Sequence, residues 1–241
     1  MHSKEIKGRI NDTSIVKAAR MAGLMFLCGL LIPALNWIFI LSKFIVTESG
    51  ISTAHNILAN EFVFRIGIIN EVITAVVIII LSIALYYILK PINKYLALLA
   101  FVLKLVDAFL TLVLALGHLV ALQILNSLSS MATTNQENVQ GIVGQFLNIH
   151  VSLTSIQGMF LGLSMSIFLY LLFKSKYIPN ALAVIGILSY VLIFIYDLLF
   201  FLSPTISSMP VVQIIGLGPN ILFTLIIGSW LLIKGLNFHK V

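Results

Sequence analysis

The sequence contains little charge. Only 9% of its 241 residues are Asp, Glu, Lys or Arg, and just 8 of them are acidic. Soluble globular domains contain about 25% charged and roughly 45–50% apolar residues, whereas 60% of this chain is hydrophobic. A soluble protein with an ordinary buried core is therefore disfavoured.

The chain also has only one cysteine, Cys28. A single thiol excludes an internal disulfide and every metal or redox motif that is built from a cysteine pair. There is no Gly-x-Ser-x-Gly nucleophile elbow and no glycine loop of the kind that binds phosphate. Nucleophilic catalysis and nucleotide binding therefore lack support in the sequence.

Long apolar stretches dominate the chain. A helix needs about 20 mostly apolar residues to cross a hydrocarbon layer of roughly 30 Å. Such stretches occur at 21–41, 62–89, 95–125, 142–173, 177–202 and 211–233. They predict an all-α polytopic membrane bundle of six transmembrane helices, which forms a single integral membrane domain over residues 1–241.

Lysine and arginine are confined almost entirely to alternate connections. Eleven of the 14 lie before the first span, after the last span, or at 90–94 and 174–176, against Lys43 alone in the other connections. By the positive-inside rule, this asymmetry predicts that both termini are cytoplasmic. The net charge of +6 is thus attributed to topology and to anionic lipid head groups, and no nucleic-acid partner is expected.

The connections differ between the two predicted sides. The inner ones are so short that the spans they join are antiparallel neighbours. On the outer side, residues 52–60 predict a capped short helix at the membrane interface, and the polar segment 126–140 predicts a mobile loop. Trp37, Tyr177 and Trp230 lie near span ends, as interfacial anchors do.

Small residues predict where helices pack closely. Thr154, Gly158, Gly162 and Ser166 recur at every fourth position of the fourth span, which allows a neighbouring helix to approach. The run 216–220 (GLGPN) interrupts the sixth span, because proline lacks an amide donor. A plain kink is the preferred interpretation, and a broken span that places backbone groups at a ligand site is the alternative.

Several runs together resemble a known bacterial membrane family. They are NILANE at 56–61 followed by Phe64-Arg65, LKPINKYLALLA at 89–100, KSKYIP at 174–179 and WLLIKG at 230–235. In order and spacing they are similar to domain of unknown function 4386. The resemblance implies a multi-span protein of the bacterial inner (cytoplasmic) membrane and carries no established activity. Members often have an acidic residue in the last span, where this chain has Asn220 and Thr224.

Polar residues form a stripe on the third span. Lys104, Asp107, Thr111 and His118 fall within about 60° of arc at about 100° per residue. A lone charge at the bilayer centre costs at least ~2.5–3.5 kcal/mol, so we expect Lys104 and Asp107 to pair along the helix. The pair is interpreted either as an internal ion pair that fixes packing or as part of a proton or ion relay.

Five ionisable residues on four spans lie at similar depth: Arg65, Glu71, His118, His150 and Asp197. Because consecutive spans alternate in direction, all of them fall toward the outer half, which predicts a polar cavity that is open to the outside. Arg65 is expected to pair with Asp197 or Glu71. The candidate ligand-binding residues are Arg65, Glu71, Lys104, Asp107, His118, His150, Gln157, Asp197 and Asn220.

Two histidines with one or two carboxylates also form a legitimate zinc set. His118 and His150 lie on different spans without a local motif, so a hydrogen-bonded cluster is preferred and no metal or cofactor is predicted. The leading hypothesis is a non-enzymatic, transporter-like or sensor-like protein that binds a small polar or amphiphilic ligand. The alternatives are a metal-assisted membrane enzyme that uses these histidines, and a structural or assembly partner of another membrane protein.

Overall fold

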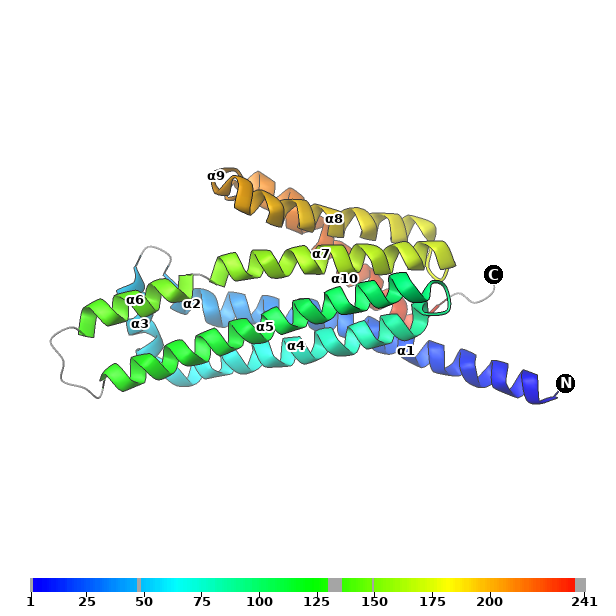
Figure 1. Ribbon diagram of the computed structural model, residues 1–241, viewed down its shortest axis with the longest axis horizontal. Helices are drawn as coiled ribbons and strands as arrows, with labels where there is room; N and C mark the ends of the chain where they lie inside the picture. The colour runs from blue at the N-terminus through cyan, green and yellow to red at the C-terminus, as the bar shows by residue number, and fades with distance from the viewer. Residues whose placement is uncertain (1, 47–48, 130–135, 149, 237–241) are drawn as a thin grey trace. The chain divides into compact units, whose positions relative to one another are not determined.

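The computed structural model describes residues 2–46, 49–129, 136–148 and 150–236. Every regular element in these ranges is helical (Figure 1). In chain order they are α1 His2–Asn36, the π-helix η1 Trp37–Leu41, α2 Ser42–Phe44, α3 Gly50–Ala59, α4 Glu61–Leu89, α5 Lys94–Ser129, α6 Gln136–Asn148, α7 His150–Ser175, α8 Asn180–Leu202, α9 Pro204–Ser207 and α10 Pro210–Ile233.

Six helical segments of the described chain are long and apolar enough to cross a membrane. They are Ser14–Phe44, Glu61–Leu89, Lys94–Ser127, Gln140–Ser175, Asn180–Leu202 and Pro210–Ile233. These segments confirm the predicted all-α bundle of six spans. The fifth span, helix α8, begins at Asn180 and not at Tyr177, because Pro179 has an extended ψ of 133° that the helix cannot include.

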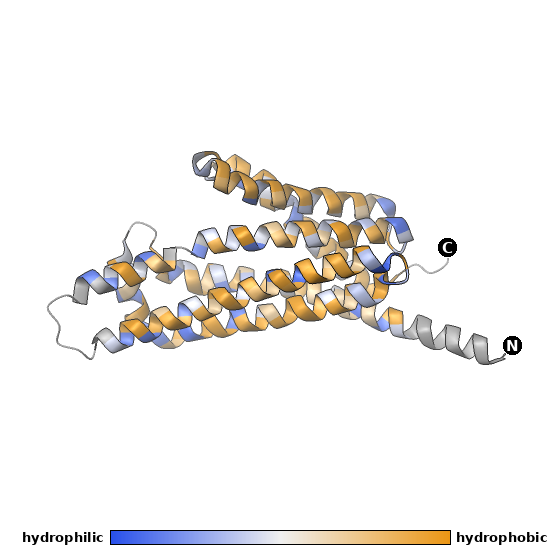
Figure 2. Ribbon diagram, viewed as in Figure 1, coloured by the Kyte–Doolittle hydropathy of each residue, from blue (hydrophilic) through white to orange (hydrophobic). Residues whose placement is uncertain are grey.

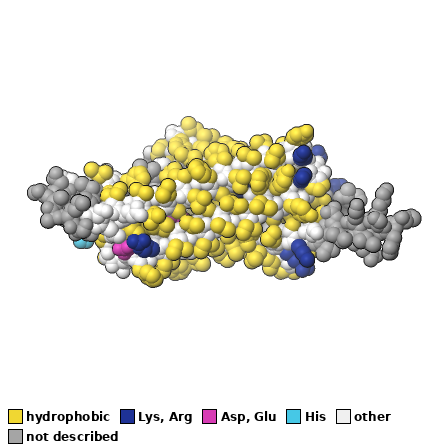
Figure 3. Space-filling view, turned by 60° about the horizontal axis from the view of Figure 1, so that its bottom comes forward, with side chains coloured by type: hydrophobic (Ala, Val, Ile, Leu, Met, Phe, Trp, Pro, Cys, Tyr) yellow, Lys and Arg dark blue, Asp and Glu magenta, His cyan; other side chains and the backbone are white. Residues whose placement is uncertain are grey.

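Large apolar side chains cover the outside of these helices. Hydrophobic residues run along all the long helices (Figure 2) and cover most of the face that Figure 3 shows. Phe62, Phe109, Ile214 and Leu222 are each 64–76% exposed. In water such a surface would favour aggregation, whereas lipid tails are as apolar as leucine and remove that cost.

The chain divides into two compact units. Unit 1 comprises Met1–Leu30, Val77–Asp107 and Gln157–Val241, and unit 2 comprises Leu31–Val76 and Ala108–Ile156. Each unit has its own buried hydrophobic cluster, with Phe168 and Phe223 central in unit 1 and Phe64 and Leu122 in unit 2. The boundaries fall within α1, α4, α5 and α7, so these helices contribute residues to both units.

Glycines let the helices of unit 1 approach closely. A Cβ added at Gly162 of α7 would lie 2.8 Å from the backbone oxygen of Tyr190 in α8. A Cβ added at Gly216 of α10 would lie 2.8 Å from the Cβ of Tyr196, also in α8. Both distances are too short for carbon, so α8 packs directly against α7 and α10 (Figure 1). The close approach predicted from the small residues of span four is confirmed at Gly162.

The last span is continuous. Pro219 lies inside α10 without ending it, although its missing amide cannot bond the carbonyl of Ile215. The alternative of a broken sixth span is therefore wrong. The helix ends instead at Ile233, and Gly235 just after it has a φ of +67°, the left-handed conformation that glycine adopts readily after a helix.

Two short helices pack together in unit 2. The predicted helix at 52–60 is α3, which begins at Gly50 because the Ser49 side chain accepts a hydrogen bond from the Ser52 amide at 3.2 Å. A Cβ at Gly50 or at Gly144 of α6 would overlap the backbone of the other helix. The backbones of α3 and α6 are therefore in direct contact (Figure 1).

The predicted mobile loop at 126–140 is wrong at both of its ends. Helix α5 continues to Ser129 and α6 begins at Gln136, while residues 130–135 lie outside the described residues. Polar composition misled the prediction, because α6 needs apolar residues on one side only. Val143 and Leu147 supply them and lie in the unit 2 cluster.

The predicted interfacial aromatics have different environments. Tyr177 is only 8% exposed and belongs to the unit 1 cluster, so it is a core residue and its prediction as an anchor is wrong. Trp230 is half-buried, and the Lys234 ammonium lies 4.3 Å from its ring centroid. A cation over an aromatic face is a favourable contact at the end of a helix.

Gly162→Ala tests the close packing of α7 against α8. The added methyl would meet the Tyr190 backbone, which cannot move aside, and we expect a loss of about 1–3 kcal/mol in stability. Gly117→Ala on α5 is the matched control, because the one described atom that a Cβ there would meet is on Phe146, at 3.8 Å. Thermal unfolding in detergent that shows equal stability for the two variants would contradict the packing.

Candidate functional site

Three candidate residues from three helices meet in unit 2. Glu71 lies in α4, His118 in α5, and His150 is the first residue of α7. One donor atom from each side chain lies within 4.8 Å of the other two. Glu71 and His118 are buried, at 7% and 2% exposure, and His150 is half-buried. Residues that share only a similar predicted depth are thus neighbours in space.

The closest polar contact in this cluster joins His118 to Glu71. The distance from Nδ1 of His118 to Oε2 of Glu71 is 2.9 Å. An ionised Glu71 carboxylate has no proton to donate, so it would accept this bond from the His118 tautomer that carries its proton on Nδ1. The bond orients the imidazole, and in that tautomer the ring lone pair lies on Nε2.

Aromatic rings hold the two histidines in place. The His118 and His150 rings are stacked, with centroids 5.1 Å apart and planes 19° from parallel. Trp37 stacks on His150 with centroids 5.5 Å apart and planes 11° from parallel. Phe64 meets His118 edge to face at 5.7 Å. The imidazoles are therefore oriented by packing as well as by the carboxylate.

The backbone that presents Trp37 is irregular. Pro33 lies inside α1 and cannot donate a helical hydrogen bond. Trp37 then begins the π-helix η1, a wider turn that is frequent at functional sites. The preceding residue, Asn36, is buried, and its Nδ2 donates to the Gly67 carbonyl of α4 at 3.1 Å. This bond ties the end of α1 to α4 where Trp37 meets His150.

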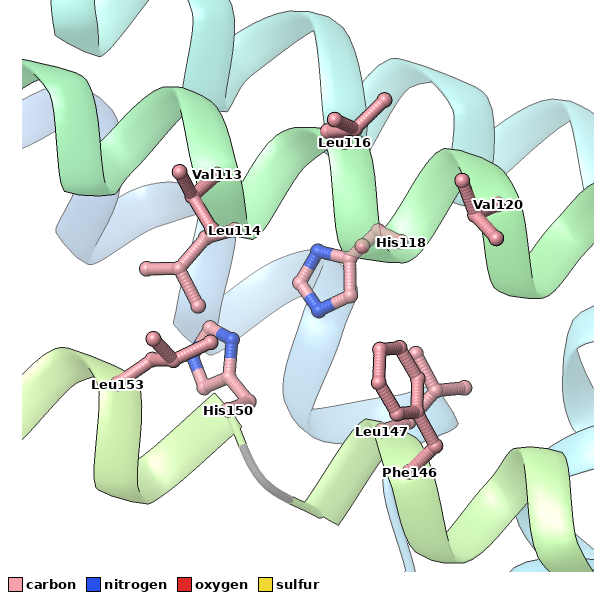
Figure 4. A pocket seen from close by; sticks show the side chains of 10 residues that line it. Val113, Leu114, Leu116, His118, Val120, Phe146, Leu147, His150 and Leu153 are labelled. Atoms are coloured by element: carbon pink, nitrogen blue, oxygen red, sulfur yellow. The ribbon is translucent and has the colours of Figure 1, made fainter.

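A cavity of about 270 Å³ lies beside the two histidines. His118 and His150 point toward one another from α5 and α7 at its wall (Figure 4). The other lining residues are apolar or glycine: Val113, Leu114, Leu116, Gly117, Val120, Phe146, Leu147 and Leu153. Among the described lining residues, the polar side chains are therefore the two imidazoles. This differs from the generally polar cavity that the sequence predicts.

A second polar group lies in unit 1. Nζ of Lys104 lies 2.6 Å from Oδ2 of Asp107, and the two residues are 3% and 1% exposed. The predicted pairing along the third span is confirmed. Nε2 of Gln157 donates to Oδ1 of Asp107 at 2.9 Å, which joins α7 to α5. Both carboxylate oxygens of Asp107 thus accept a hydrogen bond, as a buried carboxylate requires.

Unit 1 contains four further polar side chains of interest, on α8 and α10. The Tyr190 hydroxyl lies 3.4 Å from Oγ1 of Thr224. Asn220 is nearby in sequence on α10, and its Nδ2 has no hydrogen-bond partner among the described residues. The carboxylate of Asp197 is buried and lies directly over Gly158, where a Cβ would overlap it. Gly158 therefore makes room for a charged side chain and not only for a neighbouring helix.

Arg65 has a different partner from the one predicted. Its Nε donates to Oε1 of Glu61 at 2.7 Å, one turn earlier in α4, and both side chains are partly exposed, at 48% and 35%. The expectation that Arg65 pairs with Glu71 is wrong, because Glu71 bonds His118. The spacing of four residues is a known helical pair, but it is recognisable only when Glu61 is assigned to the helix.

The Glu71–His118–His150 cluster combines a carboxylate with two imidazoles. Such a set can pass a proton along the His118–Glu71 hydrogen bond, or bind a divalent metal through oxygen and nitrogen. The apolar cavity beside it can exclude water and accept a hydrophobic group. Sequence patterns missed Trp37 and Phe64 as part of this site, since Trp37 is predicted as an interfacial anchor and Phe64 enters only through a run that resembles the family.

The fold and these buried polar groups define a multi-pass α-helical membrane protein. Residues 21–235 match the family model described as Domain of unknown function (DUF4386). The chain belongs to this family, as the runs quoted above predicted. No curated protein and no solved structure matches the chain.

Lys104→Met tests the importance of the pair in unit 1. Removing the ammonium leaves the buried Asp107 carboxylate without its lysine counter-ion, and we expect a loss of about 3–5 kcal/mol. The double variant Lys104→Met/Asp107→Leu should lose less, because no charge remains. Arg65→Ala is the control, and the loss of its exposed pair should cost only about 0.2–1 kcal/mol. Equal thermal stabilities of the single and double variants would contradict this account.

Proposed function

We propose that this protein binds a small amphiphilic ligand in the cavity beside His118 and His150, as a transporter-like or sensor-like membrane protein. The observation that supports this function is the lining of the cavity. Apolar side chains form most of it, and two imidazoles form its polar wall. Ligand sites typically combine such an apolar lining with a few placed polar groups.

The size of the cavity limits the ligand. Typical sites for small molecules measure roughly 300–1,000 Å³, and this cavity measures about 270 Å³. A single short hydrocarbon chain or one small ring is compatible with this volume, whereas a whole phospholipid is not. The polar end of such a ligand would hydrogen-bond to His118 or His150.

The exposed lining residues favour entry from the lipid. Leu116, Phe146 and Val120 line the cavity and are also 59%, 48% and 40% exposed. In a membrane, exposed apolar side chains of a spanning helix face the hydrocarbon. An amphiphile that is already dissolved in the bilayer reaches such a cavity without crossing water.

The charge pattern of the connections supports an outer location for the cavity. The basic residues in the first part of α1, at the end of α7 and after α10 favour cytoplasmic termini. With this orientation His118, which lies in the later half of α5, falls in the outer half of the membrane. The ligand would then come from the outer leaflet or from the outside.

Single cysteines test this orientation. In a Cys28→Ser background, His55→Cys in the exposed part of α3 should react with a membrane-impermeant maleimide on intact cells. Lys90→Cys, in the connection between α4 and α5, should react only after the membrane is permeabilised. The reverse labelling pattern would place the termini outside and would contradict the proposed orientation.

Gly117→Leu tests ligand binding. Gly117 lines the cavity, and the nearest atom to an added Cβ is on Phe146 at 3.8 Å, so a leucine fills space that is available to a ligand. A short fatty acid that carries a diazirine should label the purified wild type, and mass spectrometry should map the adducts to residues 113–120 or 146–153. We expect at least a fivefold loss of labelling in Gly117→Leu.

Gly117→Ala serves as the matched control, because its single methyl occupies little of the cavity and favours the helix by up to about 1 kcal/mol. Labelling should remain near the wild-type level in this variant. Adducts outside these segments, or equal labelling of the leucine variant, would show that the fatty acid does not occupy the cavity.

A further inference from the structure

The donor atoms of the Glu71–His118–His150 cluster match one class of metal ion. Two imidazole nitrogens and one carboxylate oxygen bind zinc and ferrous iron in proteins. Calcium and magnesium prefer oxygen donors alone. Glu71 and His118 project from within the long helices α4 and α5, and His150 from the first residue of α7.

The environment of His150 is unusual for a histidine that only packs. Its Nδ1 is buried and has no hydrogen-bond partner among the described residues, while its ring lies between those of Trp37 and His118. A buried polar atom without a partner costs about 1–3 kcal/mol. Coordination of a cation by the Nδ1 lone pair would remove that cost.

The charge of Glu71 also favours binding of a cation. Among the described residues, His118 is the ion-pair partner of Glu71, and no lysine or arginine forms an ion pair with it. A carboxylate in a spanning helix is unfavourable unless a positive charge compensates it. A divalent cation would supply that charge, and both histidines would bind it in their neutral form.

The distances allow binding with a small rearrangement. The three donor atoms lie within 4.8 Å of one another, and ligands bound at about 2.0–2.2 Å to a tetrahedral ion lie about 3.3–3.6 Å apart. A shift of about 1 Å in the side chains therefore brings all three onto one ion.

We infer that Glu71, His118 and His150 bind one divalent transition-metal ion. Zinc represents this class of ion in the tests below. The cavity lies against both histidines, so the fourth coordination position opens toward it, as in sites that keep room for water or for a ligand. This inference goes beyond the proposed amphiphile binding and stands without it.

Zinc binding by the full chain tests the inference. Protein purified in detergent is stripped with a chelator, titrated with zinc alone and desalted, and its metal content is measured by mass spectrometry. We expect close to one zinc per chain. Glu71→Gln, His118→Ala and His150→Ala should each weaken binding at least tenfold, since even residues behind metal ligands contribute tenfold to 100-fold.

His55→Ala is the matched control, because it removes an exposed histidine of α3 that lies outside the cluster. Its zinc content should equal that of the wild type. Absence of stoichiometric zinc in the wild type, or undiminished binding in a His118→Ala/His150→Ala double variant, would overturn the inference.

A variant that gains a spectroscopic band tests the inference even if the variants above fail to fold. Nδ1 is the ring nitrogen nearer the backbone, and a metal–sulfur bond of about 2.3 Å is longer than the metal–nitrogen bond of about 2.0–2.1 Å, so His150→Cys can still reach the ion. With cobalt as the probe, this variant should show a thiolate-to-cobalt charge-transfer band. The wild type, whose only thiol is Cys28, should show cobalt d–d bands alone, and the same spectrum in the variant would refute ligation by residue 150.

Gly117→Leu separates the metal from the amphiphile. This variant changes the cavity and leaves the three donor residues in place, so it should bind zinc like the wild type while losing the fatty-acid adducts. Zinc binding without adducts in the wild type would refute only the proposed ligand. Adducts without zinc would refute only the metal.

Discussion

Charge placed in hydrocarbon must be compensated within the protein, and the polar structure of this chain depends on that constraint. Each unit meets it with a different arrangement. In unit 1, Lys104 and Gln157 together satisfy both oxygens of Asp107. Among the described residues of unit 2, the ion-pair partner of Glu71 is a histidine, His118. In the first arrangement both carboxylate oxygens accept hydrogen bonds, and helix packing explains it. In the second, the carboxylate and imidazoles can still bind a proton or a cation.

Close contact between helices supports these polar groups. Gly158 makes room for the carboxylate of Asp197, and Gly162, one turn later on α7, lets α8 approach to backbone distance. In unit 2 the contact of Gly50 with Gly144 joins α3 to α6. Helix α6 also lines the cavity through Phe146 and Leu147. Glycine is thus used where a side chain would separate the elements that define a site.

The two proposals share one wall of one cavity and differ in what they require of it. Binding of an amphiphile needs the apolar lining and the opening among exposed residues of α5 and α6. Binding of a metal needs only the three donor side chains and the rings that orient them. An ion coordinated by His118 and His150 would present its fourth position to the head group of a bound amphiphile, which would make the cavity a site for a metal-ligating group with a short apolar tail.

The sequence by itself determined the six spans, because a helix in lipid must satisfy its backbone internally and show apolar side chains outward. It also determined the Lys104–Asp107 pair, since residues three apart on one helix are neighbours whatever surrounds them. It failed for Arg65, whose partner depended on where α4 begins. Only the tertiary structure decided that Trp37, Glu71, His118 and His150 meet, because they come from four separate segments, and helix periodicity contains no information about which helices are neighbours.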